Sequence, residues 1–391
     1  MQFPRMQDLN LAGKRILIRT DFNTPINDGK IINNKRIVAA IPTIKMAVEK
    51  GALIALVSHL GRPTTKKHNQ EFSLQPAADH LKTLLDQNVR LEKEWIDGFT
   101  INKGEIVLCE NVRFIDGENT NDHALSKKIA ELCEIYVMDA FGSAHRMQSS
   151  TYGVAEYANT FCAGPLLCSE LDALSKVFDN PKHPVVAITG GSKISTKLRL
   201  LESLLEKVDQ LIVGGGIANT FLAAAGYNIG KSLFEKEMIK TAKNLLDTAK
   251  KNKSLIPIPT DVICAKEISK DAKTKCKSVA SIDINDKILD IGDETAKTYK
   301  KIIQGAGTII WNGPVGVFEH KPFEKGTAMI SKAIASSSSY SLAGGGDTIA
   351  AIEKYNVEND ISYISTGGGA FLAYLEGKEL PAVSALKGKL A

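Results

Sequence analysis

Short apolar runs separated by amphipathic stretches recur along the whole chain, and this alternation restricts the possible folds more than any other feature. The runs lie at 15–22, 52–60, 105–114, 135–146, 184–191, 211–216, 256–262, 308–316, 340–347 and 363–369. Continuous apolar runs are typical of strands buried on both faces, as in a parallel sheet. The stretches between them, such as 196–209, repeat leucine and valine at helical spacing. Strand and helix in repeated alternation predict parallel sheets with right-handed crossovers.

A long helical pattern at 164–184 interrupts this alternation in the middle of the chain. It ends in Asp-Asn-Pro and His-Pro, and both sequences stop a helix. The length of 391 residues is also more than one ordinary core accommodates. We therefore expect two doubly wound, Rossmann-like α/β domains, at 1–165 and 184–374, joined by a connecting helix at 166–183.

Composition and charge exclude several classes of protein. Hydrophobic residues make up 43% and charged residues 24%, which is the balance of a globular protein. No apolar run approaches the roughly 20 residues of a membrane span, and the N-terminus MQFPRMQDLN lacks the apolar segment of a secretory signal. A net charge of +5, spread along the chain, does not predict a nucleic-acid surface. We therefore expect a cytoplasmic protein without membrane or nucleic-acid partners.

Several familiar motifs are missing. No G-x-G-x-x-G opens a helix after the first strand, and neither a metal-spaced Cys/His cluster nor a G-x-S-x-G turn is present. Gly230-Lys231-Ser232 resembles the end of a P-loop, but Ala225 stands where that motif needs glycine. The six cysteines form no CxxC pair, so we expect reduced thiols, with Cys109 and Cys133 in the core.

The runs of the first half end in residues suited to an anion. Ligands of open α/β sheets bind beyond the carboxyl ends of the strands. These positions hold Asp21, Asn23, Arg36, His59, Arg62, Arg113, His145 and Arg146. Any one arginine alone would be read as a surface ion pair, and His59 alone as a core or turn histidine. Because four runs in succession end in the same chemistry, and arginine binds carboxylate and phosphate through two parallel hydrogen bonds, we predict a shared anionic ligand.

The runs of the second half end in glycine-rich segments instead. These are GGSK (190–193), GGG (214–216), NGPVG (312–316), AGGGD (343–347) and STGGG (365–369). Glycine before a helix lets backbone N–H groups face a phosphate, helped by the helix dipole. One such loop would indicate only a tight turn. Five in one half of the chain predict a site for the phosphates of a nucleotide.

Eight segments resemble, in order, the signature segments of the phosphoglycerate kinase family. They are RTDFNTP (19–25), SHLGRP (58–63), ENVRF (110–114), DAFGSAHR (139–146), GGSKISTKL (190–198), WNGPVGVFE (311–319), GGGDT (344–348) and STGGGA (365–370). The resemblance implies reversible phosphoryl transfer between 1,3-bisphosphoglycerate plus ADP and 3-phosphoglycerate plus ATP, with Mg²⁺. The departures are small: Thr20 and Thr24 stand where the family usually has valine, and Ser143 where threonine is common.

The resemblance also implies a role for each matching residue. Phosphoglycerate would be held by Asp21, Asn23, Arg36, His59, Arg62, Arg113 and Arg146, and the nucleotide by Lys197, Glu319, Gly345, Gly346, Asp347 and Thr348. Asp347 would carry Mg²⁺, and the expected catalytic residues are Arg36, Lys193 and Gly368. The family further implies a monomer whose C-terminal tail, 375–391, returns to the N-terminal domain.

The expected reaction needs no general base, because the carboxylate acceptor of the reverse direction is already ionised at pH 7. We expect Arg36 and Lys193 to neutralise the transferring group, since phosphoryl transfer depends on positioning and charge. Lys193 and Lys197 are four residues apart, and on one helix face they would repel unless an anion lay there. The two domains would close about the 164–184 helix. Two alternatives remain: an anion-binding protein without chemistry, and a nicotinamide dehydrogenase, which the missing fingerprint disfavours.

Overall fold

The computed structural model describes residues 3–63 and 69–388. Contacts divide the chain into two compact units, with one boundary between Asp172 and Ala173 and a second between Lys378 and Glu379. The first boundary falls inside helix α5 (Pro165–Phe178), in the stretch where the sequence predicts a connecting helix. Asp139 helps to start this helix, because its Oδ1 accepts a hydrogen bond from the Leu167 amide at 3.1 Å. Within the described ranges, no helix is both long enough and apolar enough to cross a bilayer.

Unit 1 is built on a six-stranded parallel sheet with the order β5-β6-β4-β1-β7-β8. Its strands are β1 (Arg15–Arg19), β4 (Leu53–Val57), β5 (Asn88–Glu92), β6 (Glu105–Cys109), β7 (Ile135–Met138) and β8 (Phe161–Ala163). Its helices are α1 (Lys35–Glu49), α2 (Gln75–Leu85), α3 (His123–Glu131), α4 (Val154–Tyr157) and α13 (Pro381–Gly388), and a short hairpin joins β2 (Ile26–Asn27) to β3 (Lys30–Ile31). The central strands are buried along almost their whole length, as their apolar sequences predict.

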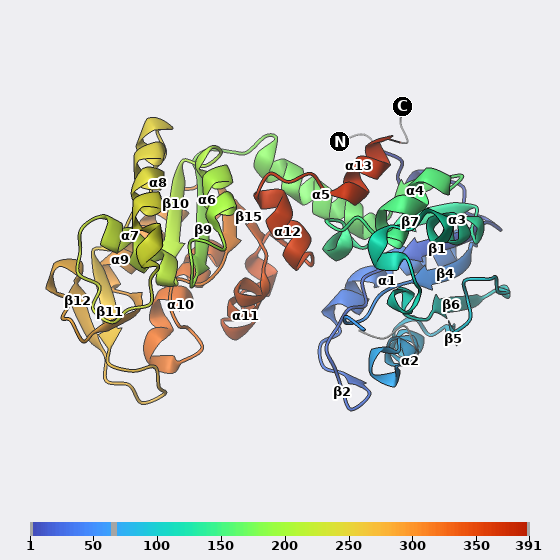
Figure 1. Ribbon diagram of the computed structural model, residues 1–391, viewed down its shortest axis with the longest axis horizontal. Coiled ribbons are helices and arrows are strands. Elements are labelled where there is room, and N and C mark those ends of the chain that lie inside the picture. Colours follow the sequence, from blue (N-terminus) through green and yellow to red (C-terminus); the bar gives the residue numbers. More distant parts are fainter. Residues whose placement is uncertain (1–2, 64–68, 389–391) are drawn as a thin grey trace. The chain divides into compact units, whose positions relative to one another are not determined.

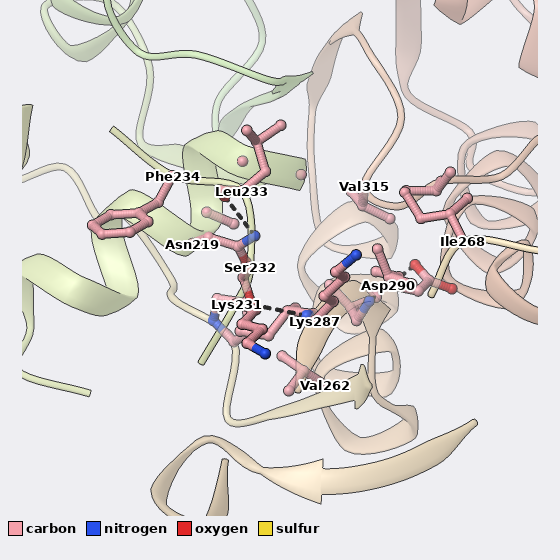
Figure 2. Close-up of a pocket in the computed structure, with 18 residues that line it drawn as sticks. Asn219, Lys231, Ser232, Leu233, Phe234, Val262, Ile268, Lys287, Asp290 and Val315 are labelled. Carbon is pink, nitrogen blue, oxygen red and sulfur yellow. Dashed lines mark hydrogen bonds between the residues drawn. The ribbon is translucent and has the colours of Figure 1, made fainter. Parts of the chain in front are cut away.

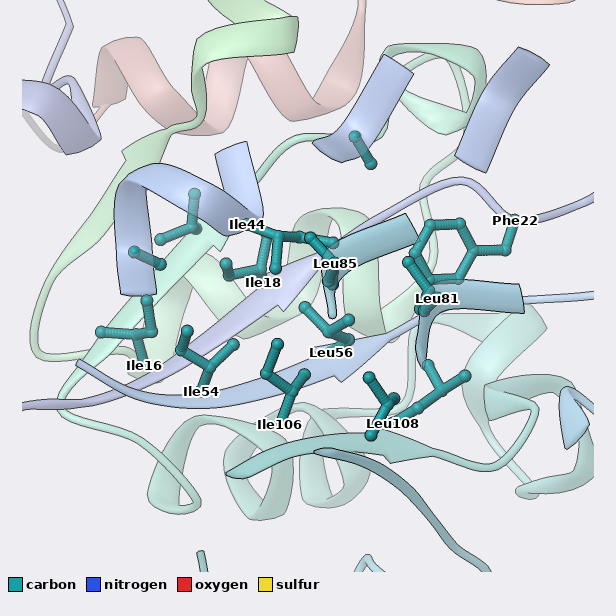
Figure 3. Close-up of a cluster of buried hydrophobic side chains, with 14 of the residues drawn as sticks. Ile16, Ile18, Phe22, Ile44, Ile54, Leu56, Leu81, Leu85, Ile106 and Leu108 are labelled. Carbon is teal, nitrogen blue, oxygen red and sulfur yellow. The ribbon is translucent and has the colours of Figure 1, made fainter. Parts of the chain in front are cut away.

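Alternate residues of three neighbouring strands form the core on one face of this sheet. Figure 3 shows Ile16 and Ile18 of β1, Ile54 and Leu56 of β4, and Ile106 and Leu108 of β6 in a row beneath Ile44 of α1 and Leu81 and Leu85 of α2. The C-terminal segment belongs to the same unit, since the Ala382 amide donates to the Ala144 carbonyl at 3.2 Å. The tail thus returns to unit 1 from Glu379 on, whereas residues 375–378 of the expected tail belong to unit 2.

Unit 2 contains a five-stranded parallel sheet with the order β10-β9-β14-β15-β16 (Figure 1). The strands are β9 (Val185–Gly191), β10 (Gln210–Gly214), β14 (Thr308–Asn312), β15 (Tyr340–Ala343) and β16 (Tyr363–Ile364). The helices are α6 (Leu198–Leu205), α7 (Gly215–Ala224), α8 (Ile239–Lys251), α9 (Asp293–Gln304), α10 (Lys325–Ala335), α11 (Gly346–Lys354) and α12 (Gly368–Leu375). The two parallel sheets confirm the predicted fold class.

A second, antiparallel sheet in unit 2 departs from the prediction. It has the order β12-β11-β13, with β11 (Asp261–Ala265), β12 (Lys275–Ser278) and β13 (Lys287–Ile291). The predicted strand at 256–262 was wrong in its bounds, because the backbone becomes a strand only at Asp261. The sequence of β12, Lys-Cys-Lys-Ser, carries no apolar pattern because the strand is mostly exposed.

The cysteines behave as the sequence predicts. Cys109 and Cys133 are buried, and all six cysteines are free thiols.

Candidate active site

The loops at the carboxyl edge of the unit 1 sheet are held together by backbone hydrogen bonds. β1 pairs with β4 on one side and with β7 on the other, so the chain reverses its direction of winding at β1. Beyond the strand ends, the Thr20 amide donates to Val57, the Asp139 amide donates to Arg19, and the Val112 amide donates to Ser58. Ligands of doubly wound sheets bind at such a switch point. The residues that follow these strands therefore share one edge.

Arg36, at the start of α1, is fixed by the loop that follows β1. Its Nη1 donates to both carboxylate oxygens of Asp21 at 3.1 Å and to the carbonyl of Asn23 at 3.1 Å. The side chain of Asn23 in turn accepts a hydrogen bond from the Gly61 amide at 2.8 Å. Asp21 is buried and committed to Arg36, so it orients an arginine rather than serving as a free base.

The basic residues predicted for unit 1, Arg36, His59, Arg62, Arg113 and Arg146, gather with Arg19 into one cluster, which we call the arginine cluster. Burial, followed by the charges of Arg19, Arg113 and Arg146, lowers the pKa of His59 well below its ordinary value. Burial and the charges of Arg146 and Arg19 lower the pKa of Arg113 to about 10. Burial and the charge of Arg62 lower the pKa of Arg146. Burial is the largest cause of each lowered pKa, and the neighbouring arginines add to it, so an anion bound here would stabilise the charged forms.

Arg19 is the member that sequence reasoning missed. It ends β1, it is completely buried, and its guanidinium donates to Ser150 Oγ at 2.9 Å and to the Thr20 carbonyl, and approaches His59 Nδ1 at 3.3 Å. The signal in the sequence was a charged residue at the end of an apolar strand, because arginine is almost never fully buried unless it is paired.

Lys197 links three strand ends of unit 2. Its Nζ donates to the Gly190 carbonyl at 2.7 Å and to Asn312 Oδ1 at 2.8 Å, and Asn312 Nδ2 donates to the Gly344 carbonyl at 2.8 Å. These contacts join the ends of β9, β14 and β15, and β9 is the strand where the winding of this sheet reverses. Burial lowers the pKa of Lys197 to about 8, against an opposing effect of Asp347. A half-buried ammonium group whose hydrogen bonds within the described residues all go to neutral acceptors is suited to a phosphate.

The proposed helical relation between Lys193 and Lys197 was wrong. Helix α6 begins at Leu198, with Lys197 as its N-cap, so both lysines precede the helix. Lys193 is exposed beside Glu235, which accepts a hydrogen bond from the Ser195 amide at 2.9 Å. Repulsion along one helix face therefore gives no argument for an anion here.

The five glycine-rich loops are not equivalent. A side chain at Gly190, Gly214 or Gly216 would collide with the backbone of the neighbouring loops, so these glycines allow strand ends to pack closely. Around Gly346 and Gly368, by contrast, a Cβ would meet no atom within 4 Å. Both open positions are the first residues of helices, α11 and α12. Only these two loops leave backbone at a helix N-terminus open to a ligand.

The loop before α11 also carries polar groups that suit a ligand. Gly345 adopts a φ of 101°, in the region that favours glycine. Asp347 is exposed, whereas Thr348 is buried, and its Oγ1 has no hydrogen-bond partner among the described residues. Such an orphaned hydroxyl at a helix N-terminus is expected where a ligand completes the bonding.

Unit 2 also contains a cavity of about 560 Å³ that the sequence did not indicate. Its walls come from the start of α7, β13, the segments 231–234 and 315–317, and from Pro259, Val262 and Ile268 in and beside β11. Figure 2 shows Leu233 and Phe234 on one side and Ile268 and Val315 on the other. Leu233 and Ile268 are about half exposed, at 58% and 50%, so the mouth of the cavity is apolar. The lining segments lie far apart in the sequence and share no motif, which is why the sequence did not indicate the cavity.

Glu319 and Lys193 are exposed, and the structure shows no hydrogen bond of either side chain to the Lys197 group within the described ranges. Their roles remain predictions.

One parallel α/β sheet carries the arginine cluster. The other carries a half-buried lysine, two helices that begin at glycines with free space beside them, and an apolar cavity. Together these features indicate a two-domain kinase of small molecules. The phosphoglycerate kinase family model matches residues 6–378, so the chain belongs to the phosphoglycerate kinase family. It catalyses reversible phosphoryl transfer between 1,3-bisphosphoglycerate and ADP, with ATP and ADP as co-substrates.

Solved structures agree with this membership. Phosphoglycerate kinase from Coxiella burnetii is 52% identical, with a TM-score of 0.96 over 100% of both chains. The enzyme from Pyrococcus horikoshii OT3 is 32% identical, with a TM-score of 0.82 over 99% of this chain and 98% of the other.

Proposed function

We propose that the arginine cluster of unit 1 holds phosphoglycerate and that the Lys197 group of unit 2 holds the nucleotide. The observation that carries this assignment is the gathering of five arginines and His59 at one edge of the sheet, where burial and then the charges of Arg146 and Arg19 lower the pKa of Arg113 to about 10. A phosphorylated carboxylic acid supplies the charge that such a site lacks, and arginine binds both of its anionic groups through paired hydrogen bonds.

On the phosphoglycerate side, the proposed ligands are Asp21, Asn23, Arg36, His59, Arg62, Arg113 and Arg146. Asp21 acts by holding Arg36, and Asn23 acts by holding the Gly61 amide in the loop that carries Arg62. His59 binds as a neutral donor, because burial and the surrounding arginines keep its pKa low.

On the nucleotide side, Lys197 and the loop Gly345-Gly346-Asp347-Thr348 bind phosphate oxygens. The apolar cavity receives the base, since Gly215 and Gly216 line it at the end of β10, next to the Lys197 group. Val317 lines the cavity two residues before Glu319, which we assign to the ribose hydroxyls. Base, sugar and phosphates would then lie along one edge of the sheet.

Mg²⁺ fits this site through Asp347. In 3–63 and 69–388 no group of three or more acidic, histidine or cysteine side chains could hold a metal ion. Mg²⁺ commonly uses one or two carboxylates together with substrate phosphates, so a single exposed carboxylate beside a phosphate site suits it. When bound, the ion would neutralise phosphate charge.

The reaction then needs positioning and charge rather than a base. Arg36 and Lys193 neutralise the transferring group, and the open N-terminus of α12 at Gly368 offers backbone N–H groups to it. Because the two ligands bind to different units, we propose closure about residues 166–183, with 1–165 plus 375–391 and 184–374 as the two bodies. Solution scattering should show a smaller radius of gyration only with both ligands present.

Replacement of Arg36 tests this proposal. Arg36→Ala should lower the rate of a coupled assay for ATP formation by about 10² to 10³ fold, as loss of one charge-stabilising donor does. Arg90→Ala is the matched control, because Arg90 belongs to the same unit but pairs with Glu92 of the edge strand β5 and with Glu105 of the neighbouring strand β6. An Arg36→Ala enzyme as active as Arg90→Ala would refute the role of Arg36.

We further propose that the protein is a cytoplasmic monomer. A mass measured in solution by light scattering would test the monomer, and fractionation of cells would test the location.

A further inference from the structure

Among the described residues of the arginine cluster, Arg19 differs from the other arginines because the protein itself occupies all three of its nitrogens. Nε donates to Ser150 Oγ at 2.9 Å, Nη1 donates to the Thr20 carbonyl, and Nη2 lies 3.3 Å from His59 Nδ1. The side chain is completely buried at the end of β1. A guanidinium that is used in this way supports its neighbours rather than binding a ligand.

The contact with His59 fixes the proton on that ring. Arginine is only a donor and does not lose its proton in proteins. Nδ1 of His59 must therefore accept the hydrogen bond from Arg19, and a neutral ring then carries its proton on Nε2. His59 itself is 2% exposed, and burial followed by the charges of Arg19, Arg113 and Arg146 lowers its pKa, so the ring lies among the residues of the arginine cluster.

Behind Arg19 stands a buried carboxylate that the reaction does not otherwise use. Glu118 is completely buried, and its two oxygens accept from Ser150 Oγ at 2.6 Å and from the Ser150 amide at 3.0 Å. The Ser150 hydroxyl donates its proton to Glu118, so its oxygen is able to accept the hydrogen bond from Arg19 Nε. Tyr136 of β7 holds Ser150 from the other side, through a hydrogen bond of 2.6 Å to its carbonyl.

We propose that Glu118, Ser150 and Arg19 form a buried positioning chain that holds His59 in its Nε2–H tautomer, so that the ring offers a hydrogen-bond donor to the anionic substrate. Each link fixes the direction of the next, from a carboxylate that only accepts to a guanidinium that only donates. The proposal rests on the assignment of the arginine cluster to phosphoglycerate.

Nitrogen NMR of the ligand-free protein tests the tautomer directly. The chain has seven histidines, and loss of one signal in His59→Gln assigns the ring. With all histidines labelled with ¹⁵N, long-range proton–nitrogen spectra should show His59 as neutral with the proton on Nε2. In Glu118→Gln and in Ser150→Ala, a second population of His59 with the proton on Nδ1 should appear. A wild-type ring protonated on Nδ1 would overturn the proposal.

Steady-state kinetics distinguishes a role in positioning His59 from a general loss of structure. Glu118→Gln and Ser150→Ala should raise the KM for 3-phosphoglycerate about tenfold, the effect of one lost charge-assisted hydrogen bond, and leave the KM for ATP unchanged. Glu105→Gln is the matched control, because Glu105 is a buried acid of the same unit that begins β6 and pairs with Arg90. This control should change neither KM.

Equal effects of Glu118→Gln on both KM values, or on neither, would refute the chain. If Arg36→Ala abolishes activity while Glu118→Gln keeps the wild-type KM, the proposed function stands and the positioning chain fails. If the tautomer changes as expected but Arg36→Ala stays active, the assignment of the cluster to phosphoglycerate fails instead.

Discussion

Nucleotide binding should draw a proton onto Lys197. This ammonium group lies between the Gly190 carbonyl and Asn312 Oδ1, and burial lowers its pKa to about 8 from an ordinary value of 10.5. A phosphate placed against it would favour the charged form and return the pKa toward that ordinary value. Binding is therefore expected to be coupled to proton uptake in the pH range between those two values.

The size of the effect follows from the pKa. At pH 8 about half of the free protein has an uncharged Lys197, so uptake should be about 0.5 proton per nucleotide; at pH 9 it should approach about 0.9, and near pH 6 it should vanish. The difference between the pKa of 10.5 and the pKa of about 8 corresponds to about 3 kcal/mol by which burial of the charged Lys197 lowers the stability of the folded protein. Because the folded pKa lies below the unfolded one, this cost is present below pH 8 and is relieved as the pH rises toward 10.5.

Calorimetric titration of ADP in buffers of different ionisation enthalpy measures the proton number. The same titration of Lys197→Met gives the protons that belong to the nucleotide itself, and the difference between the two proteins isolates Lys197. Lys193→Met is the control, because this nearby lysine is exposed and should leave the uptake unchanged. No difference between wild type and Lys197→Met at pH 8 to 9 would refute the reasoning.

Two other predictions concern stability. Gly216→Ala should lower the melting temperature, because a Cβ there would collide with the Ser192 carbonyl, whereas Gly346→Ala, with no atom within 4 Å, should melt as the wild type does; equal melting of both variants would contradict the packing argument. Burial raises the pKa of Asp139 to about 7 from 3.8, so the stability linked to this group is present below pH 4 and lost as the pH rises through 7. The urea midpoint of Asp139→Asn should therefore depend less on pH than that of the wild type between pH 4 and 7. An identical pH dependence of the two midpoints would show that Asp139 does not titrate in this range.

The parallel sheets could be predicted because their strands are buried on both faces and therefore read as continuous apolar runs. The two edge strands of the unit 1 sheet escaped the prediction for different reasons: β5 is only partly buried, whereas β8 is buried but has only three residues, too few for a recognisable apolar run. The antiparallel β12 is mostly exposed and carries two lysines in four residues. A buried strand of sufficient length is recognisable from its run of apolar residues, whereas an exposed strand has no such run.

Much of the candidate site followed from chemistry at the strand ends. Arg113 and Arg146 lie in the loops after β6 and β7, and the parallel register brings those loops to one edge. Arg19 was not predicted, because a single arginine at the end of an apolar strand does not indicate a function until its hydrogen-bond partners are known. The cavity of unit 2 did not follow either, since separate segments between Gly215 and Val317 form it and none carries a recognisable motif.

The central claim assigns one ligand to each unit, and a crossed binding measurement tests it most directly. Calorimetry with 3-phosphoglycerate and with ADP, each titrated separately into Arg36→Ala and Lys197→Met, gives four affinities. The account predicts that Arg36→Ala loses affinity for 3-phosphoglycerate and keeps that for ADP, and that Lys197→Met does the reverse. If either variant loses both ligands, or loses the one assigned to the other unit, the division of the site between the two sheets is wrong.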